Sequence, residues 1–326
     1  MTTSEEDNSI EHITSTIKST KLTDSQAEKL KSIIESIPTI LTSLENSNYD
    51  EIYGYRINTT DKEYVNESIR NEILLKFLAA DQYNVELSKQ RIIKTLNWRN
   101  KFQPLHAAFV EKFHVELNEL GVITNSKSNK QNLKVITWNL YGNLKNPKKI
   151  FEKFGGGSTT EFPGSQFLRW RIGLMEKSLQ LIDFSSVENN KIGQIHDYKN
   201  VSMFKIDPNM KVATKEIIEI FGNNYPELLS TKFFINVPLI MGWVFTFFKT
   251  IKVINEDTLK KFQVLNHGNL TESLNTEDLS KDYCGSLNKS LFDLDVSNEI
   301  KLTEYGEIIL KKLSDDEIEH VNDDVE

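Results

Sequence analysis

Strands that alternate with helices over the C-terminal two thirds of the chain are the feature that most constrains its fold. Four segments alternate apolar and polar residues and are rich in β-branched and aromatic types, as β-strands are: 134–142, 191–198, 232–237 and 260–266. Between them, residues 165–182, 209–224 and 238–252 carry apolar side chains at helical spacing. This order predicts βαβ units, and hence an α/β domain with a mixed or parallel sheet covered by helices.

The N-terminal part follows a different pattern. Residues 23–44, 66–80 and 85–102 place apolar residues on one stripe of a helix, and Pro38 and Pro104 are expected to end or kink these helices. The chain therefore begins with a small helical lobe. The first 20 or so residues are rich in Ser, Thr and Glu and are expected to be disordered, and the acidic C-terminus is expected to be solvated or disordered.

Charge and cysteine content exclude several classes of function. Acidic residues outnumber basic ones 47 to 39, giving a net charge of −8, so no attraction of the whole surface to nucleic acid or anionic lipid is expected. Any phosphate or membrane contact must be local. Cys284 is the single cysteine, which excludes an intramolecular disulfide and fits a reducing compartment. The N-terminus has no secretory or transit features, so a cytoplasmic location is expected.

The most apolar run of the chain covers residues 233–248. Its 16 residues are interrupted by Asn236, Pro238 and Gly242. A helix needs roughly 20 apolar residues to span a bilayer. The run is therefore predicted to be a core or interfacial segment.

Catalytic motifs offer no support for a hydrolase, because the sequence has no nucleophile elbow, no HExxH and no paired zinc ligands. The predicted strand at 191–198 is more informative, since it places Gln194, His196 and Tyr198 on one face of the sheet. One interpretation is a hydrogen-bonded histidine beside an aromatic on a half-buried sheet. The other is the floor of a pocket in which a tyrosinate ligates ferric haem and the imidazole holds or shares its proton.

Cations within apolar segments are a second candidate feature. Arg171 lies in the helical segment 165–182, Lys232 directly precedes FFINV, and Tyr141 ends the strand at 134–142. Such cations are often surface side chains that lay an apolar stem along the protein. Alternatively, they receive a carboxylate or phosphate at the mouth of an apolar cavity. Both interpretations stand at the level of the sequence.

Several longer segments resemble the CRAL-TRIO lipid-transfer family. Residues 74–102 are similar to the helical lead-in of these proteins, and HDYKNVS, NNYPELLSTKFFINVP and NEDTLKKFQVL are similar to their lipid-binding domain. The resemblance covers about residues 49–285. It implies a helical N-terminal lobe and a sheet-floored apolar cavity under a movable gate helix, here 238–249. It also implies a phosphatidylinositol carrier without enzymatic activity, which touches membranes transiently through that helix. A plain core helix is the alternative for 238–249.

The resemblance divides the chain into an extension at 1–22, a helical lobe at 23–107, the lipid-binding domain at 108–285 and a C-terminal extension at 286–326. The family's pattern for the lipid headgroup carries over to Glu227, Thr258 and Lys261. Lysine supplies charge for a phosphate, threonine a hydroxyl donor and glutamate an acceptor for inositol hydroxyls. Two positions depart from the pattern: Asp81 replaces an arginine of lipid-exchanging members, and the closing Phe-Gly-Gly is Tyr-Cys-Gly at 283–285.

A narrower branch of the family resembles haem-binding proteins. Its pattern maps onto five residues here: Tyr141, Arg171, His196, Tyr198 and Lys232. The resemblance implies b-type haem with Tyr198 as the axial ligand of the iron, His196 as its neighbour, and the two cations as partners of the propionates. The function expected is phosphatidylinositol transfer by a cavity that also binds haem. The alternative is a dedicated haem-binding redox or stress-response protein with little lipid exchange. Peripheral association with endoplasmic reticulum or microsomal membranes is also expected.

Overall fold

The computed structural model describes residues 3–144, 152–155, 162–201, 208–237 and 256–323. The chain forms two compact units, one made of Met1–Glu111 with Lys301–Glu326 and the other of Lys112–Ile300. The structure therefore differs from the expected single extension at 286–326. Its residues up to 300 belong to the second unit, and the remainder packs on the helical lobe.

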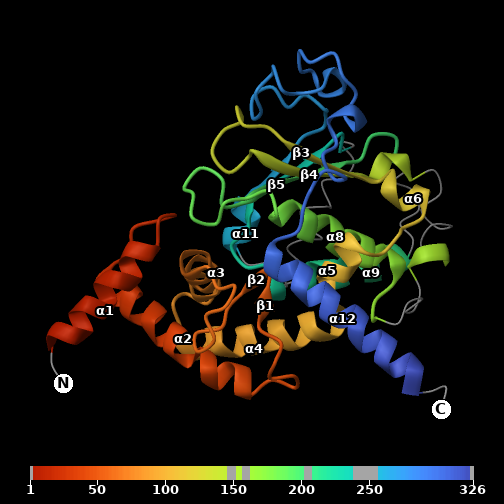
Figure 1. Cartoon of the computed structure of the whole chain (residues 1–326). Helices are drawn as coiled ribbons and strands as arrows, with labels where there is room; N and C mark the ends of the chain where they lie inside the picture. The colour runs from red at the N-terminus through yellow and green to blue at the C-terminus, as the bar shows by residue number, and fades with distance from the viewer. Residues whose placement is uncertain (1–2, 145–151, 156–161, 202–207, 238–255, 324–326) are drawn as a thin grey trace. The chain divides into compact units, whose positions relative to one another are not determined.

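The first unit is helical, as predicted (Figure 1). Its elements are α1 (Thr3–Thr16), α2 (Asp24–Thr42), a hairpin of β1 (Glu51–Ile52) and β2 (Tyr55–Arg56), α3 (Glu67–Ala80), α4 (Val85–Phe102), α5 (Pro104–Phe109) and α12 (Glu304–Asp323). The three helices predicted from apolar spacing are confirmed as α2, α3 and α4. Thr23 and Gln26 form a capping box at the start of α2, which continues past Pro38. Pro104 does end α4, because α5 begins at that residue.

Both ends of the chain are more ordered than their composition predicts. The disorder expected for residues 1–22 is wrong over Thr3–Thr16, which form α1. Ile13 and Ile17 are buried, and a carboxylate oxygen of Glu72 on α3 accepts hydrogen bonds from the backbone N–H groups of Lys18 and Ser19 at 2.8 and 2.9 Å. The acidic tail, expected to be solvated or disordered, is helical as far as Asp323 within α12, and the first turn of this helix is anchored by the Tyr305 hydroxyl, which donates to Asp50. Tertiary contacts thus supply the order that a polar composition hides.

A buried ion pair fixes the hairpin of the first unit against α4. The Arg99 guanidinium donates to both carboxylate oxygens of Glu51 at 2.8 and 3.1 Å, and both side chains are 0% exposed. Glu51 also accepts from the Tyr49 hydroxyl and from the Gly54 N–H. Because every oxygen of this carboxylate is hydrogen-bonded, the charge can remain in the interior.

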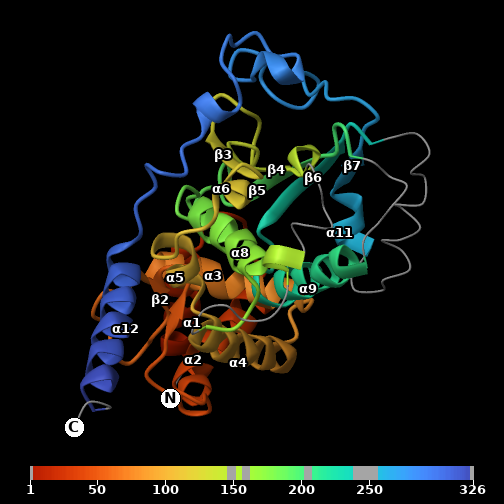
Figure 2. The same cartoon turned by 90° about the vertical axis from the view of Figure 1, so that its right-hand side faces the viewer.

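The second unit is built on a five-stranded sheet, which Figure 2 shows above α8 and α9. In order across the sheet, the strands are β3 (Gly121–Asn125), β4 (Val135–Leu140), β5 (Ile192–Asp197), β6 (Leu229–Ile235) and β7 (Phe262–Val264). Within this sheet the β3–β4 pairing is antiparallel, and the pairings β4–β5, β5–β6 and β6–β7 are parallel. The four predicted strands and the mainly parallel sheet are thus confirmed, whereas β3 was not predicted. The other elements are α6 (Val115–Asn118), η1 (Tyr141–Asn143), α8 (Gln166–Leu179), α9 (Pro208–Asn224), α11 (Glu256–Lys260), η3 (Lys281–Tyr283) and η4 (Phe292–Leu294).

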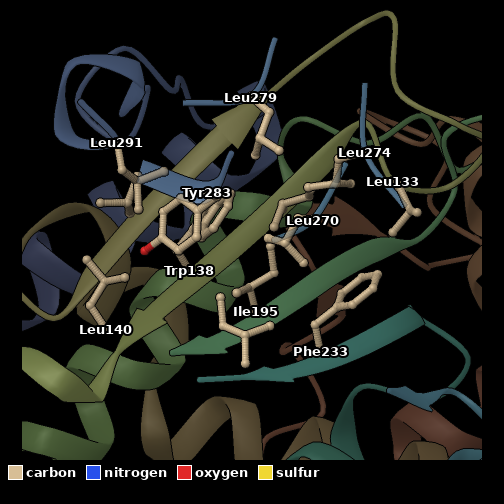
Figure 3. Packing of buried hydrophobic residues seen from close by; sticks show 13 residues of the cluster. Leu133, Trp138, Leu140, Ile195, Phe233, Leu270, Leu274, Leu279, Tyr283 and Leu291 are labelled. Carbon is tan, nitrogen blue, oxygen red and sulfur yellow. The ribbon is translucent and has the colours of Figure 1, made fainter. Parts of the chain in front are cut away.

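The two faces of this sheet differ in chemistry. One face is an apolar core in which Ile136, Trp138, Ile195 and Phe233 pack against Leu270, Leu274, Leu279, Tyr283 and Leu291 of the segment that follows β7 (Figure 3). The opposite face, on the side of α8 and α9 (Figure 2), is lined by polar and aromatic residues in register across the strands. They are Thr137 and Asn139 of β4, Gln194 and His196 of β5, and Lys232 and Phe234 of β6. A polar face that is largely buried points to a function rather than to core packing.

Candidate functional site

Four aromatic rings gather at the carboxyl ends of β4, β5 and β6. The Tyr141 ring lies 5.4 Å from the His196 ring and 5.6 Å from the Tyr198 ring, measured between centroids. Phe234 lies 5.3 Å from His196 and 6.4 Å from Tyr198. The prediction that His196 and Tyr198 share one face of the sheet is confirmed. Parallel neighbouring strands end at the same edge, which explains why residues so distant in sequence meet there.

Two cations lie beside three of these rings, and we call the five residues the basic aromatic cluster: Tyr141, Arg171, His196, Tyr198 and Lys232. The Cζ atom of Arg171, from α8, lies 4.8 Å from the centroid of the Phe221 ring. Lys232 Nζ lies 5.4 Å from the Phe234 centroid and 5.7 Å from the Phe262 centroid. Arg171 is 1% exposed, so the interpretation of this residue as a surface cation is wrong. The structure brings all five predicted residues together.

The Arg171 guanidinium has an unusual environment for a buried charge. None of its three nitrogens has a hydrogen-bond partner within the described residues, and neither has Nε2 of His196. Burial lowers the pKa of Arg171, and the nearby Tyr141 hydroxyl, which is not within ordinary hydrogen-bond geometry of any of the three nitrogens, offsets only part of that shift. An unpaired buried guanidinium is costly. The donors therefore fit an anionic ligand with two acceptor oxygens, such as a carboxylate.

Burial shifts the protonation of the other cluster residues toward their neutral forms. It raises the pKa of Tyr198 far above its ordinary value, and it lowers the pKa of His196 well below 6.5, assisted by the charges of Lys232 and Arg171. The pKa of Lys232 falls to about 7 for the same reasons, burial first and the Arg171 charge second. In the ligand-free protein the imidazole is therefore neutral at physiological pH, and the Tyr198 phenol is protonated.

The three predicted headgroup residues lie near the amino ends of β6 and β7, at the other end of the strands from the basic aromatic cluster. Glu227 precedes β6, whereas Thr258 lies in α11 and Lys261 directly precedes β7. Lys261 Nζ donates to Oε2 of Glu227 at 3.3 Å, and the Thr258 carbonyl accepts the Lys261 N–H at 3.1 Å. The sequence reasoning missed Lys191, whose Nζ faces the same Glu227 oxygen at 3.9 Å. The three residues expected to bind a headgroup are thus neighbours.

The positions that depart from the family's pattern have structural partners of their own. Asp81 accepts two hydrogen bonds from Arg91, at 2.7 and 2.9 Å, so its charge is neutralised within the first unit. Tyr283 packs on Trp138 with ring centroids 4.7 Å apart, and its hydroxyl donates to Asp197 at 3.0 Å. The expected gate at 238–249 lies outside the described residues. In the described part of the chain, no helix is long and apolar enough to cross a membrane, and no cluster of three His, Cys, Asp or Glu side chains could hold a metal ion.

Comparison with a protein-family model identifies the family to which this fold belongs. The model described as CRAL/TRIO domain matches residues 129–285. This range includes both groups of candidate residues and every strand of the sheet except β3. The chain belongs to the CRAL-TRIO family. The fold predicted from the resemblance is therefore confirmed.

Individual relatives narrow the comparison. The Phosphatidylinositol transfer protein SFH5 of Candida albicans is 73% identical over 98% of this chain and 99% of its own length. The protein of the same name from Saccharomyces cerevisiae is 36% identical over 91% of this chain and 98% of its own length. Among solved structures, the crystal structure of Sfh5 matches with a TM-score of 0.82 and 37% identity, covering 91% of this chain and 100% of the other.

Proposed function

We propose that this chain binds phosphatidylinositol and moves it between membranes without covalent chemistry. The contact that carries the proposal is the Lys261–Glu227 pair, which combines a cation for a phosphate with a carboxylate for ring hydroxyls. The names of the relatives support this choice of lipid. Thr258, next to the pair, adds a hydroxyl donor.

Transfer between vesicles tests this proposal. The purified chain should move labelled phosphatidylinositol from donor to acceptor vesicles, and Lys261→Ala should lower the rate by about tenfold because a charged contact to the phosphate is lost. Lys89→Ala is a matched control, since Lys89 is a lysine of similar exposure paired with Glu86 on α4. Wild-type protein that moves no phosphatidylinositol would refute the carrier function. We further propose a cytoplasmic protein that associates peripherally with endoplasmic reticulum membranes, which cell fractionation can test.

Haem is the second ligand that we propose, at the polar face of the sheet that carries the basic aromatic cluster. The observation that favours it is the buried Arg171 guanidinium without a hydrogen-bond partner in the described part of the chain, beside His196 and two tyrosines. Acyl chains would leave this guanidinium unpaired. Carboxylates would pair it, and the residues present therefore fit a ligand that is aromatic in its body and anionic at its rim.

Each residue of the cluster has a role in that proposal. Bound ferric haem would supply an iron cation, which stabilises a phenolate. It would also supply two carboxylates, which accept hydrogen bonds from Arg171 and Lys232. Tyr198 would provide the phenolate ligand. His196, neutral at physiological pH, can accept the phenol proton on Nε2 when its own proton is on Nδ1. Tyr141 would supply a hydrogen-bonding hydroxyl beside both rings.

Absorption spectroscopy separates the two ligands. Protein produced with sufficient iron should be red-brown with a Soret band, and ligand-free protein should take up added hemin with a defined stoichiometry. A colourless preparation that also fails to take up hemin would remove the haem proposal. If hemin-loaded protein still transfers phosphatidylinositol at the rate of the ligand-free protein, the alternative of a dedicated haem protein is refuted.

A further inference from the structure

Three charged side chains meet at the amino ends of β5, β6 and β7. Lys191 directly precedes β5, Glu227 lies two residues before β6, and Lys261 directly precedes β7. Oε2 of Glu227 lies 3.3 Å from Lys261 Nζ and 3.9 Å from Lys191 Nζ. One carboxylate oxygen therefore faces two ammonium groups that come from opposite neighbouring strands.

The backbone holds Lys191 in place independently of this contact. The Asn132 side-chain oxygen accepts hydrogen bonds from the N–H groups of Asn190 and Lys191 at 2.9 and 3.2 Å. Glu227 has a left-handed backbone with φ of 52°, which is strained for a residue with a side chain and persists only where the surroundings impose it. Both charged groups are thus carried by a constrained backbone, which reduces the entropy lost when a ligand binds.

The charges of the three residues do not balance. Among these three described side chains, two ammonium groups face one carboxylate, an excess of one positive charge. The side chains of Lys191 and Lys261 are 31% and 24% exposed, so a ligand can reach both. The Lys261 charge and, more strongly, burial lower the pKa of Lys191, which means that an added anion would relieve an existing repulsion. A phosphodiester carries the single negative charge that neutralises the group.

We propose that Lys191 is a further phosphate-binding and specificity-determining residue, which with Lys261 holds the phosphate of an inositol phospholipid while Glu227 accepts hydrogen bonds from the ring hydroxyls. The inference rests on the proposed function of phosphatidylinositol binding. Two lysines at this place also reject choline phospholipids, because a quaternary ammonium would approach two like charges. Lys191 therefore favours inositol over choline headgroups.

The test measures which lipid the protein takes from mixed vesicles. Purified full-length chain is incubated with vesicles of phosphatidylcholine and phosphatidylinositol, re-isolated, and its bound lipids are quantified by mass spectrometry. Lys191→Met keeps the apolar stem and should lower the ratio of bound phosphatidylinositol to phosphatidylcholine by about tenfold. Lys191→Arg should retain most of the ratio, and Lys89→Met should leave it unchanged. Thermal melting of each variant confirms that the fold is intact.

A second arm distinguishes a lipid headgroup from a free phosphate ester. Soluble inositol 1-phosphate is titrated into wild type and Lys191→Met by calorimetry. Weak or absent binding there, together with the lost lipid preference, supports a site for the headgroup of a membrane lipid. Equal lipid ratios for wild type and Lys191→Met overturn the role of Lys191 while the proposed function stands. Wild type that takes up no phosphatidylinositol overturns the proposed function, and the inference with it unless inositol 1-phosphate binds in a Lys191-dependent way.

Discussion

Replacing Lys232 with methionine should stabilise the ligand-free protein, and more so at low pH. The lysine is half-buried among Phe234, Phe262 and the Arg171 charge, and its pKa is lowered from 10.5 to about 7. Below pH 7 the folded protein must hold this ammonium charged. At about 1.4 kcal/mol per unit of pKa, the shift from 10.5 to about 7 corresponds to a cost of ~5 kcal/mol.

The sign of the pH dependence follows from the two pKa values. Between pH 7 and 10.5 the unfolded chain keeps the Lys232 proton and the folded chain releases it, so the free energy of unfolding rises with pH. The advantage of Lys232→Met should therefore fall from ~5 kcal/mol at pH 6 to ~2 kcal/mol at pH 9. Urea denaturation followed by tryptophan fluorescence at both pH values measures it, with Lys89→Met as the control. An advantage that is equal at both pH values, or larger at pH 9, would refute the reasoning.

Three further predictions concern other contacts. Tyr198→Phe removes only a hydroxyl, so it should abolish most hemin uptake while the circular dichroism spectrum stays unchanged. His196→Ala should shift the absorption spectrum with a smaller loss of hemin. An unchanged absorption spectrum of hemin-loaded Tyr198→Phe would exclude Tyr198 as the iron ligand. Arg99→Met leaves the Glu51 carboxylate buried and unpaired and should lower the free energy of unfolding by about 3–5 kcal/mol, so a change below 1 kcal/mol in denaturant titrations would contradict that contact. Tyr305→Phe should cost about 1.5–3 kcal/mol through the lost hydrogen bond to Asp50 and should increase proteolysis within α12; unchanged protection would show that apolar packing alone holds the helix.

The regular elements of the fold could be predicted because their periodicity is local. Apolar spacing located α3 and α4 to within a residue, and alternation located β5 from the letters IGQIHD. Strand β3 was missed, since its buried Val122 and Ile123 are adjacent and do not alternate with polar residues. Helix α1 is polar, and its order depends on contacts from Glu72, more than 50 residues away in the chain.

The candidate site was only partly accessible to sequence reasoning. The spacing of His196 and Tyr198 predicts one shared face, but the resemblance to a family was needed to join Arg171 to them, because a residue on α8 reaches the sheet only through the tertiary fold. Lys191 carried no signal at all. It is one of many lysines in the sequence, and its approach to Glu227 follows from the pairing of β5 with β6.

The division of the chain into units has a consequence for its synthesis. The first unit contains both ends of the polypeptide, and the second unit is inserted between them. During synthesis, Asp50, which directly precedes β1, can therefore form its hydrogen bond with Tyr305 only after the whole second unit has been made. A released chain truncated after Ile300 should hold a folded second unit and a first unit that is still sensitive to protease. For the same reason, tags at either terminus report on one and the same lobe of the molecule.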